Sequence, residues 1–120
     1  MAISEIEGTS EVSYTYATGW SDYSAANPRT KIRRNKNQVI AQIYGIHSSN
    51  IANGDSITVL TLDSRYKPID VVQTMGVGLT SSEVKGAVIA QINSSGELKI
   101  TNITGSNITR VYVMVAYNIN

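Results

Sequence analysis

The sequence predicts an all-β domain, an antiparallel β-sandwich or jelly-roll-like head with eight or nine short strands. The first observation is composition: the chain is rich in Ile, Val, Thr and Tyr, which favour strands, and in Ser and Asn, which favour turns. The second is the spacing of apolar residues, which recur at every second position, while no segment keeps the 3.6-residue repeat of an amphipathic helix. The third is the short spacing of the turns between these runs, which is typical of sandwiches and barrels.

The N-terminal part is expected to hold a leader and two short strands. Residues 1–10 show no persistent apolar pattern and include two acidic residues, so we expect a flexible leader or the stub of a stalk. Residues 11–120 are expected to form a single head domain, because a chain of this length supports one buried core. Its first strands are predicted at 11–17 and 29–34.

The next part of the chain predicts two strands around a polar loop. Over 38–47 the apolar residues alternate between two faces, which predicts a long strand. The polar stretch 48–55 that follows contains an Asn-Gly pair and is predicted to be a loop. A second strand is predicted at 56–62, where the alternation resumes.

The following segment predicts a further strand and a hairpin. A strand is predicted at 70–79, and its two glycines indicate a bulge or a close approach of another backbone at Gly76 and Gly78. The runs 86–92 and 97–103 flank a turn of small polar residues, so they are predicted to pair as a hairpin. The second arm alternates apolar and polar residues, which indicates one buried face and one wet face.

The last predicted strand, 109–118, is apolar on both faces. One face carries Val111, Val113, Val115 and Tyr117, and the other carries Tyr112, Met114 and Ala116. Such a strand is central in a sandwich, or its outer face meets another subunit.

Composition argues against an enzyme. The chain has no cysteine, which excludes a disulfide framework, a thiolate metal site and thiol catalysis. His47 is the only imidazole, and its neighbours match no known catalytic or metal-ligand spacing. The carboxylates that could converge in space fall at predicted turns or strand ends, where Asp ordinarily forms turns: Asp55, Asp63 and Asp70. No phosphate-binding loop or dinucleotide motif occurs, so we expect no catalytic residues, no metal and no cofactor.

The overall charge gives no reason to expect nucleic acid or a membrane as a partner. The formal net charge is +1, and 16% of the residues are charged. This balance creates no broad field that would attract a polyanion or an anionic membrane. The longest uncharged run is studded with polar residues, so no transmembrane span is predicted either. Any electrostatic function must therefore be local.

One local charge feature does occur, a basic strip made of Arg29, Lys31, Arg33 and Arg34. On a strand, Arg29, Lys31 and Arg33 would line one face, about 6.5 to 7 Å apart. Such a row could contact phosphodiesters in a nucleic acid or in a phosphate-bearing glycan. The alternative is a solvated edge strand that its charges protect from aggregation. Aromatic residues do not interleave with the strip, which argues against nucleic acid.

The aromatic residues suggest contact with sugars. The chain has seven Tyr, one Trp and no Phe, so every aromatic ring combines an apolar face with a polar atom. The tyrosines within strong strands are expected in the core or at a subunit contact: Tyr44, Tyr112 and Tyr117. Those in or beside predicted loops are better binding candidates: Trp20, Tyr23 and Tyr66, together with His47. For His47 the alternative is a solvent-exposed side chain at a strand end.

The layout from Trp20 to the C-terminus resembles the C-terminal head domains of tail, fibre and baseplate receptor-binding proteins of phages that infect Gram-positive bacteria. The likeness runs through RRNKNQVIAQIYGIHSSNIANGDSITVLTLDSRYKPIDVV to the hairpin GAVIAQINSSGELKIT. These heads share an aromatic near the start, a basic turn before a long strand, a polar loop, an apolar strand ending at a leucine, and an aromatic-basic-proline step. The family commonly has proline directly after that leucine, where this chain has Asp63.

The resemblance implies a β-sandwich head, usually a homotrimer on a stalk, that adheres to host cell-wall polysaccharide without cleaving it. It also implies a place at the tail tip or baseplate of a virion, with the N-terminus joined to other tail or baseplate proteins. No binding residue of the family matches by motif. From the loop argument alone, we expect the saccharide site at Trp20, His47, Asp55, Arg65 and Tyr66. Two alternatives stay open, a structural tail or baseplate domain and a carbohydrate-binding module of cellular origin.

Overall fold

The computed structural model describes residues 9–24, 26 and 28–119, which form ten strands and one 3₁₀ turn. The elements are β1 (Thr9–Glu11), β2 (Tyr14–Tyr16), β3 (Trp20–Asp22), β4 (Lys31–Asn35), β5 (Gln38–Ile51), β6 (Ser56–Leu62), η1 (Ser64–Tyr66), β7 (Val72–Leu79), β8 (Val84–Ile92), β9 (Glu97–Asn102) and β10 (Ile108–Asn118). The predicted all-β fold is confirmed.

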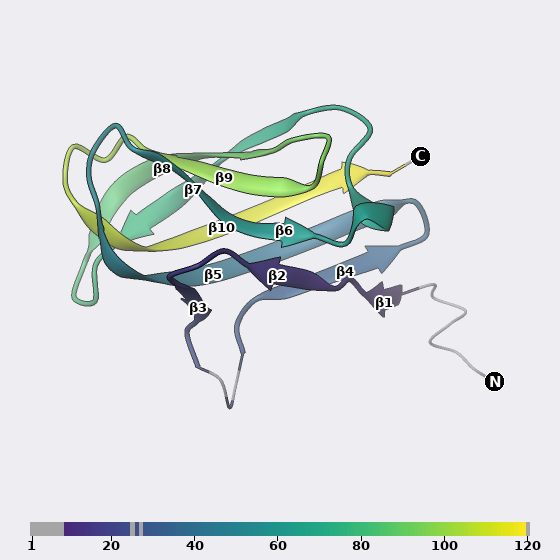
Figure 1. Cartoon of the computed structure of the whole chain (residues 1–120), viewed down its shortest axis with the longest axis horizontal. Helices are drawn as coiled ribbons and strands as arrows, with labels where there is room; N and C mark the ends of the chain where they lie inside the picture. The colour runs from purple at the N-terminus through teal and green to yellow at the C-terminus, as the bar shows by residue number, and fades with distance from the viewer. Residues whose placement is uncertain (1–8, 25, 27, 120) are drawn as a thin grey trace.

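All ten strands belong to one antiparallel sheet that curls over into two facing layers (Figure 1). The strand order is β1-β4-β5-β10-β7-β8-β9-β6-β2. One side of the 14-residue β5 pairs with β10, and the other side pairs with β4 near its start and with β3 near its end. In Figure 1, β6, β8 and β9 lie in front of β5 and β10.

The N-terminal segment ties the two ends of the sheet together. β1 pairs with β4 at one end of the strand order, and β2 pairs with β6 at the other. The link between them is bonded to both sides, because the Val12 NH donates to the Ile32 carbonyl and the Ser13 carbonyl accepts from the Asp63 NH, each at 2.9 Å. This segment therefore closes the open side of the curled sheet.

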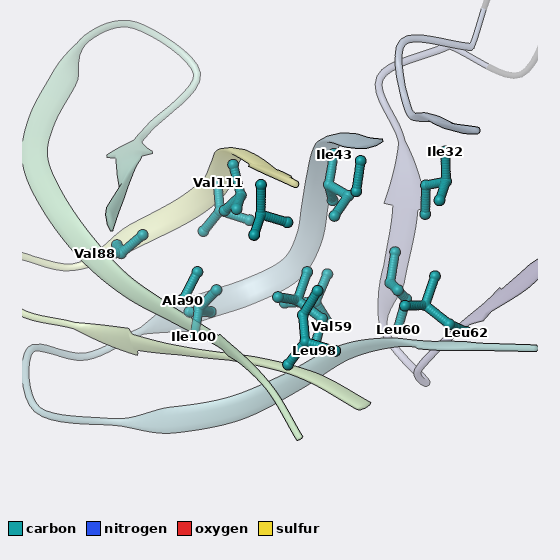
Figure 2. Close-up of a cluster of buried hydrophobic side chains, with 14 of the residues drawn as sticks. Ile32, Ile43, Val59, Leu60, Leu62, Val88, Ala90, Leu98, Ile100 and Val111 are labelled. Atoms are coloured by element: carbon teal, nitrogen blue, oxygen red, sulfur yellow. The ribbon is translucent and has the colours of Figure 1, made fainter. Parts of the chain in front are cut away.

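The core lies between the two layers (Figure 2). From one layer come Val59, Leu98 and Ile100, and from the other Ile43 and Val111, all with no exposed surface. Figure 2 shows these side chains pointing toward one another across the interior. Because each strand alternates, the residues between them point outward and are free to form a functional surface.

The two ends of the molecule differ. The distal end carries the turns 52–55, 80–83 and 103–107. The proximal end carries the turn 93–96 and η1, and the described termini lie on this side (Figure 1). Strand β6 leads from one end to the other, and seven residues of strand span roughly 23 Å.

Several predicted elements are confirmed almost to the residue. The strand 56–62 is β6, the hairpin arms are β8 and β9, and 109–118 lies within β10. β10 lies between β5 and β7, with Val111, Val113, Val115 and Tyr117 buried. Its other face is open in the single chain, since Met114 is 54% exposed. The strand is thus central and still has an uncovered outer face.

Other elements differ from the prediction. The strand predicted at 11–17 is two strands, because the chain crosses from β4 to β6 between them. The loop predicted at 48–55 shrinks to 52–55, since β5 continues to Ile51, which is buried and pairs with Ile108. β3 was not predicted. Of the predicted leader, residues 1–8 lie outside the described residues, and Thr9 and Ser10 lie in β1.

Gly76 and Gly78 fit the prediction of a bulge and a close backbone approach. The pairing of β7 with β8 shifts register between Gly78 and Leu79. A Cβ on Gly76 would lie 2.6 Å from the Tyr112 carbonyl oxygen, which is closer than any side chain tolerates. Glycine at this position is therefore needed for β7 to pack against β10.

We predict that Gly76→Ala lowers the free energy of unfolding by about 1–3 kcal/mol, because the new methyl group must push β7 away from β10. Urea unfolding followed by tryptophan fluorescence measures this change. Ser81→Ala in the exposed 80–83 turn is the control and should change stability by less than about 0.5 kcal/mol. Equal stability of Gly76→Ala and the wild type would contradict the close approach.

Candidate functional site

Three tyrosines and two arginines gather on the outer face of the sheet, toward the distal end. We call them the tyrosine-arginine cluster, and its members are Tyr23, Arg29, Tyr44, Arg110 and Tyr112. The Tyr23 and Tyr44 rings meet edge to face at 5.3 Å between centres, and Tyr44 lies 5.8 Å from Tyr112. The Arg29 guanidinium lies 4.3 Å from the Tyr23 ring centre, within the range of a cation-π contact.

The register of the sheet places the cluster. Tyr44 of β5 lies directly opposite Tyr112 of β10. Arg110 lies two residues before Tyr112, so it points to the same outer face, and its cross-strand partners are Ile46 and Leu79. The other two members come from outside the strands, because Tyr23 follows β3 and Arg29 precedes β4.

Asp22 holds the chain that carries Tyr23 and Arg29. Its Oδ1 accepts hydrogen bonds from the backbone NH groups of Tyr23 and Arg29, both at 2.7 Å. Its Oδ2 accepts from the Thr30 NH at 3.0 Å and from the Tyr16 hydroxyl at 3.4 Å. One carboxylate thus fixes the start and the end of the connection from β3 to β4.

Thr30 extends this clamp into the sheet. Its hydroxyl lies 2.6 Å from the Tyr16 hydroxyl, accepts from the Tyr44 NH at 2.9 Å and donates to the Tyr44 carbonyl at 3.2 Å. Burial raises the pKa of the Tyr16 hydroxyl well above its ordinary range, so Tyr16 stays a neutral donor and acceptor. The clamp therefore links β2, β3 and the start of β4 to the backbone of β5.

Burial raises the pKa of the Asp22 carboxyl, but the hydrogen bonds that it accepts from backbone NH groups of Arg29, Thr30 and Tyr23 outweigh this effect. The pKa of Asp22 therefore lies below its ordinary value of 3.8. Because the folded state prefers the ionised form, this contribution to stability is complete above the ordinary pKa. It is lost as the pH falls through the lowered pKa of the folded state.

We predict that Asp22→Asn destabilises the fold by about 1–3 kcal/mol, since one amide oxygen cannot accept all the hydrogen bonds that the carboxylate accepts. Amide hydrogen exchange should speed up at Arg29 and Thr30 before it does in the core strands. Unchanged exchange at these two amides would contradict the clamp.

The same clamp predicts a pH dependence. Between about pH 6 and about pH 2.5, the wild type should lose more unfolding free energy than Asp22→Asn does, because only the wild type protonates this carboxylate. Urea titrations at the two pH values measure the difference. Parallel losses in the two proteins would show that Asp22 contributes nothing to acid sensitivity.

A shallow groove of about 330 Å³ separates the cluster from the 80–83 turn. Its lining residues include Tyr23, Tyr44 and the two arginines of the cluster, together with the hydroxyl-rich segment Thr80–Glu83. Aromatic faces beside hydroxyl and guanidinium donors suit the stacking and hydrogen bonding by which proteins bind sugars. The groove is open to solvent and can admit part of a longer polymer.

Of the residues predicted for the saccharide site, Trp20 and His47 lie together. They face each other across the β3–β5 pair with ring centres 4.9 Å apart. The Trp20 indole is 7% exposed and packs against Gly45, where a Cβ would lie 2.9 Å from it. His47 Nδ1 lies 2.8 Å from the Ser49 carbonyl oxygen. In this arrangement the indole is part of the hydrophobic core.

The other three predicted residues lie apart from this pair. Asp55 closes the 52–55 turn at the distal end, where its carboxylate accepts from the Ala52 NH at 3.2 Å. Arg65 and Tyr66 lie in η1 at the proximal end, and Arg65 pairs with Asp63 at 2.9 Å. Hydrogen bonds from Arg65 lower the pKa of Asp63 to about 2. The five residues therefore do not form one site in the single chain.

The basic strip is divided between two faces. Lys31 and Arg33 are exposed on the outer face of β4, where they border a second shallow groove with Ile40 and Gln42. Arg29 precedes β4 and contacts the rings of Tyr23 and Tyr44. Arg34 points to the opposite side and donates to the Lys36 carbonyl at 3.1 Å. Because β1 pairs with residues 33–35, that part of β4 is not an edge.

Sequence reasoning placed Tyr44 and Tyr112 in the core or at a subunit contact because they lie in strong strands, and it did not single out Arg110. The available signal was alternation: Arg110 and Tyr112 are in step with the exposed Met114, while Val111 and Val113 are buried. Within the described ranges, no group of three or more His, Asp or Glu residues is placed to hold a metal ion. No helix in the described part of the chain has the length and apolar character to cross a membrane.

The fold matches that of a solved phage protein. The crystal structure of the head domain of phage bIL170, from work on receptor binding domains of lactococcal phages, aligns over 93% of this chain and 97% of its own with a TM-score of 0.68. The two sequences are 11% identical, so the likeness shows a shared fold. No protein-family model and no curated protein sequence matches the chain. The head-domain fold expected from the resemblance is thereby confirmed.

Proposed function

We propose that the chain is the receptor-binding head of a phage tail, which adheres to a host cell-surface saccharide without cleaving it. The observation that carries the proposal is the open groove beside the tyrosine-arginine cluster, on a fold shared with a phage receptor-binding domain. In this proposal the head sits at the tail tip or baseplate of the virion, and its N-terminal side joins other tail or baseplate proteins. The host ligand is a cell-wall polysaccharide.

In the proposed complex, a sugar ring stacks on the Tyr23 side chain, whose exposed fraction is 43%. Tyr44 and Arg29 both contact the Tyr23 ring, so little side-chain freedom is lost on binding. Hydroxyl groups of the sugar meet the polar wall at 80–83. Lys31 and Arg33 extend the contact along β4, where phosphate groups of the polymer would find two exposed cations.

We predict that Tyr23→Ala weakens binding of the head to purified host-wall polysaccharide about tenfold, because the stacking surface is lost. Surface plasmon resonance on immobilised polysaccharide measures the affinity. Arg65→Ala is the comparison, since it removes an exposed side chain that contacts the Tyr66 ring at the proximal end. If Arg65→Ala loses affinity and Tyr23→Ala does not, the contact lies at the proximal end and this assignment of the site is wrong.

We also propose that the head is a homotrimer, with subunits meeting through the outer face of β5, β10 and β7. This face carries three exposed apolar side chains: Ile40 (44%), Met75 (62%) and Met114 (54%). Among the described residues of these three strands, the central part of the face has no charged side chain. A single subunit rarely leaves three such side chains together in water. A trimer contact would cover them and leave the cluster at its distal margin.

Sedimentation equilibrium is expected to give the trimer mass for the wild type at micromolar concentration. Met114→Glu should shift the mass to that of the monomer, because three carboxylates would be buried at one contact. Ile103→Glu is the control, since Ile103 is equally exposed but lies in a distal turn. A monomeric wild type would contradict the proposed assembly.

The two alternatives make different predictions for the same preparations. A structural tail or baseplate domain would assemble through the apolar face but bind no host polysaccharide. A carbohydrate-binding module of cellular origin would bind polysaccharide but would not adsorb to bacterial cells that the phage infects, nor compete with virions for them. Glycan-array binding together with adsorption to host cells separates these cases.

A further inference from the structure

The tyrosine-arginine cluster contains two arginines that form no ion pair among the described residues. Arg29 and Arg110 lie 4.3 and 5.8 Å from the same Tyr23 ring centre. Among the described residues, the ion pairs are Arg65 with Asp63 and Lys85 with Glu83, so neither cluster arginine has a carboxylate partner there. The Asp22 carboxylate accepts from backbone NH groups and from a tyrosine hydroxyl instead.

Arg110 also has a donor without an acceptor. Its Nε atom is buried and has no hydrogen-bond partner within the part of the chain that the structure describes. A buried donor on a charged group is unfavourable unless an acceptor is supplied. Because Arg110 lines the groove, a bound molecule would meet its side chain there, at atoms other than this buried Nε.

Among the described residues, those of the 80–83 turn that line the groove form no ion pair with Arg29 or Arg110. Glu83 lines the groove, but its carboxylate pairs with the Lys85 ammonium at 2.5 Å. That contact lowers the pKa of the Glu83 carboxyl. The neighbouring residues, Ser81 and Ser82, contribute hydroxyl groups that can donate to an anion.

We infer that the groove binds an oxyanion, a phosphate or carboxylate group, between the guanidinium groups of Arg29 and Arg110. Guanidinium groups match the paired oxygens of both anions, and two of them on one aromatic ring repel each other less when an anion lies between them. The inference rests on the proposed function for the source of the anion, which is a charged substituent of the bound glycan. The Tyr23 ring would then stack on the sugar that carries it.

NMR titration of the ¹⁵N-labelled full chain at constant ionic strength tests the site without host material. The probes are inorganic phosphate, glycerol phosphate, glucuronate and glucose. The anions should give saturable shifts at the amides of Tyr23, Arg29 and Arg110, and glucose alone should not. Glycerol phosphate and glucuronate separate a phosphate-bearing from a carboxylate-bearing glycan, and binding of either supports the site.

The variants decide which groups bind. Arg110→Gln and Arg29→Gln should each weaken phosphate binding about tenfold or more, whereas Arg65→Gln at the proximal end should leave it unchanged. Arg110→Lys keeps the charge and should retain part of the affinity, which guards against misfolding as the cause of a loss. Absence of saturable shifts, or equal losses in Arg110→Gln and Arg65→Gln, would overturn the inference. Polysaccharide binding that persists without phosphate binding would refute the oxyanion site and leave the proposed function intact.

Discussion

The pairing of β5 with β10 is the interaction on which the rest of the structure depends. The two strands run side by side from Gln38 and Asn118 at the proximal end to Ile51 and Ile108 at the distal end. In this register, Val39, Ala41 and Ile43 point into the core with the valines of β10, and Tyr44 and Tyr112 point out together. A slip of one residue would bury the tyrosines and expose the valines, so the core and the outer surface are specified by one constraint.

The second requirement is the clamp that brings non-strand residues to this surface. Strand pairing alone fixes Tyr44, Arg110 and Tyr112, but Tyr23 and Arg29 belong to the connection between β3 and β4. They reach the outer face because Asp22 binds backbone NH groups at both ends of that connection and Thr30 binds the backbone of β5. These hydrogen bonds hold Tyr23 and Arg29 at the two ends of that connection, which reduces the entropy lost when the two side chains bind a ligand.

Alternation in the sequence was enough to predict the strands of the central layer, since Val111, Val113 and Val115 are spaced for one buried face. The glycines of β7 also predicted a close backbone approach, and at Gly76 the nearby Tyr112 carbonyl leaves no room for a side chain. The short strands β1, β2 and β3 were harder to predict, because each is three residues long and owes its conformation to a distant partner strand. The local sequence pattern of a three-residue strand does not indicate which distant strand it pairs with.

In the candidate site, too, the sequence pattern predicted local features, whereas contacts that depend on distant strand pairing were missed. Loop position favoured Trp20 as a binding residue, yet its indole fills the space above Gly45, a contact that depends on the β3–β5 pairing. Cluster members come from four separate parts of the chain, and strand register together with the Asp22 and Thr30 clamp brings them to one face. Hydrogen-deuterium exchange of the head with and without purified host-wall polysaccharide tests the central claim most directly, that the groove between the cluster and the 80–83 turn is the contact surface. The account predicts slower exchange at the amides of 29–30 and 80–84 on binding. Slower exchange confined to 63–67 at the proximal end would contradict it.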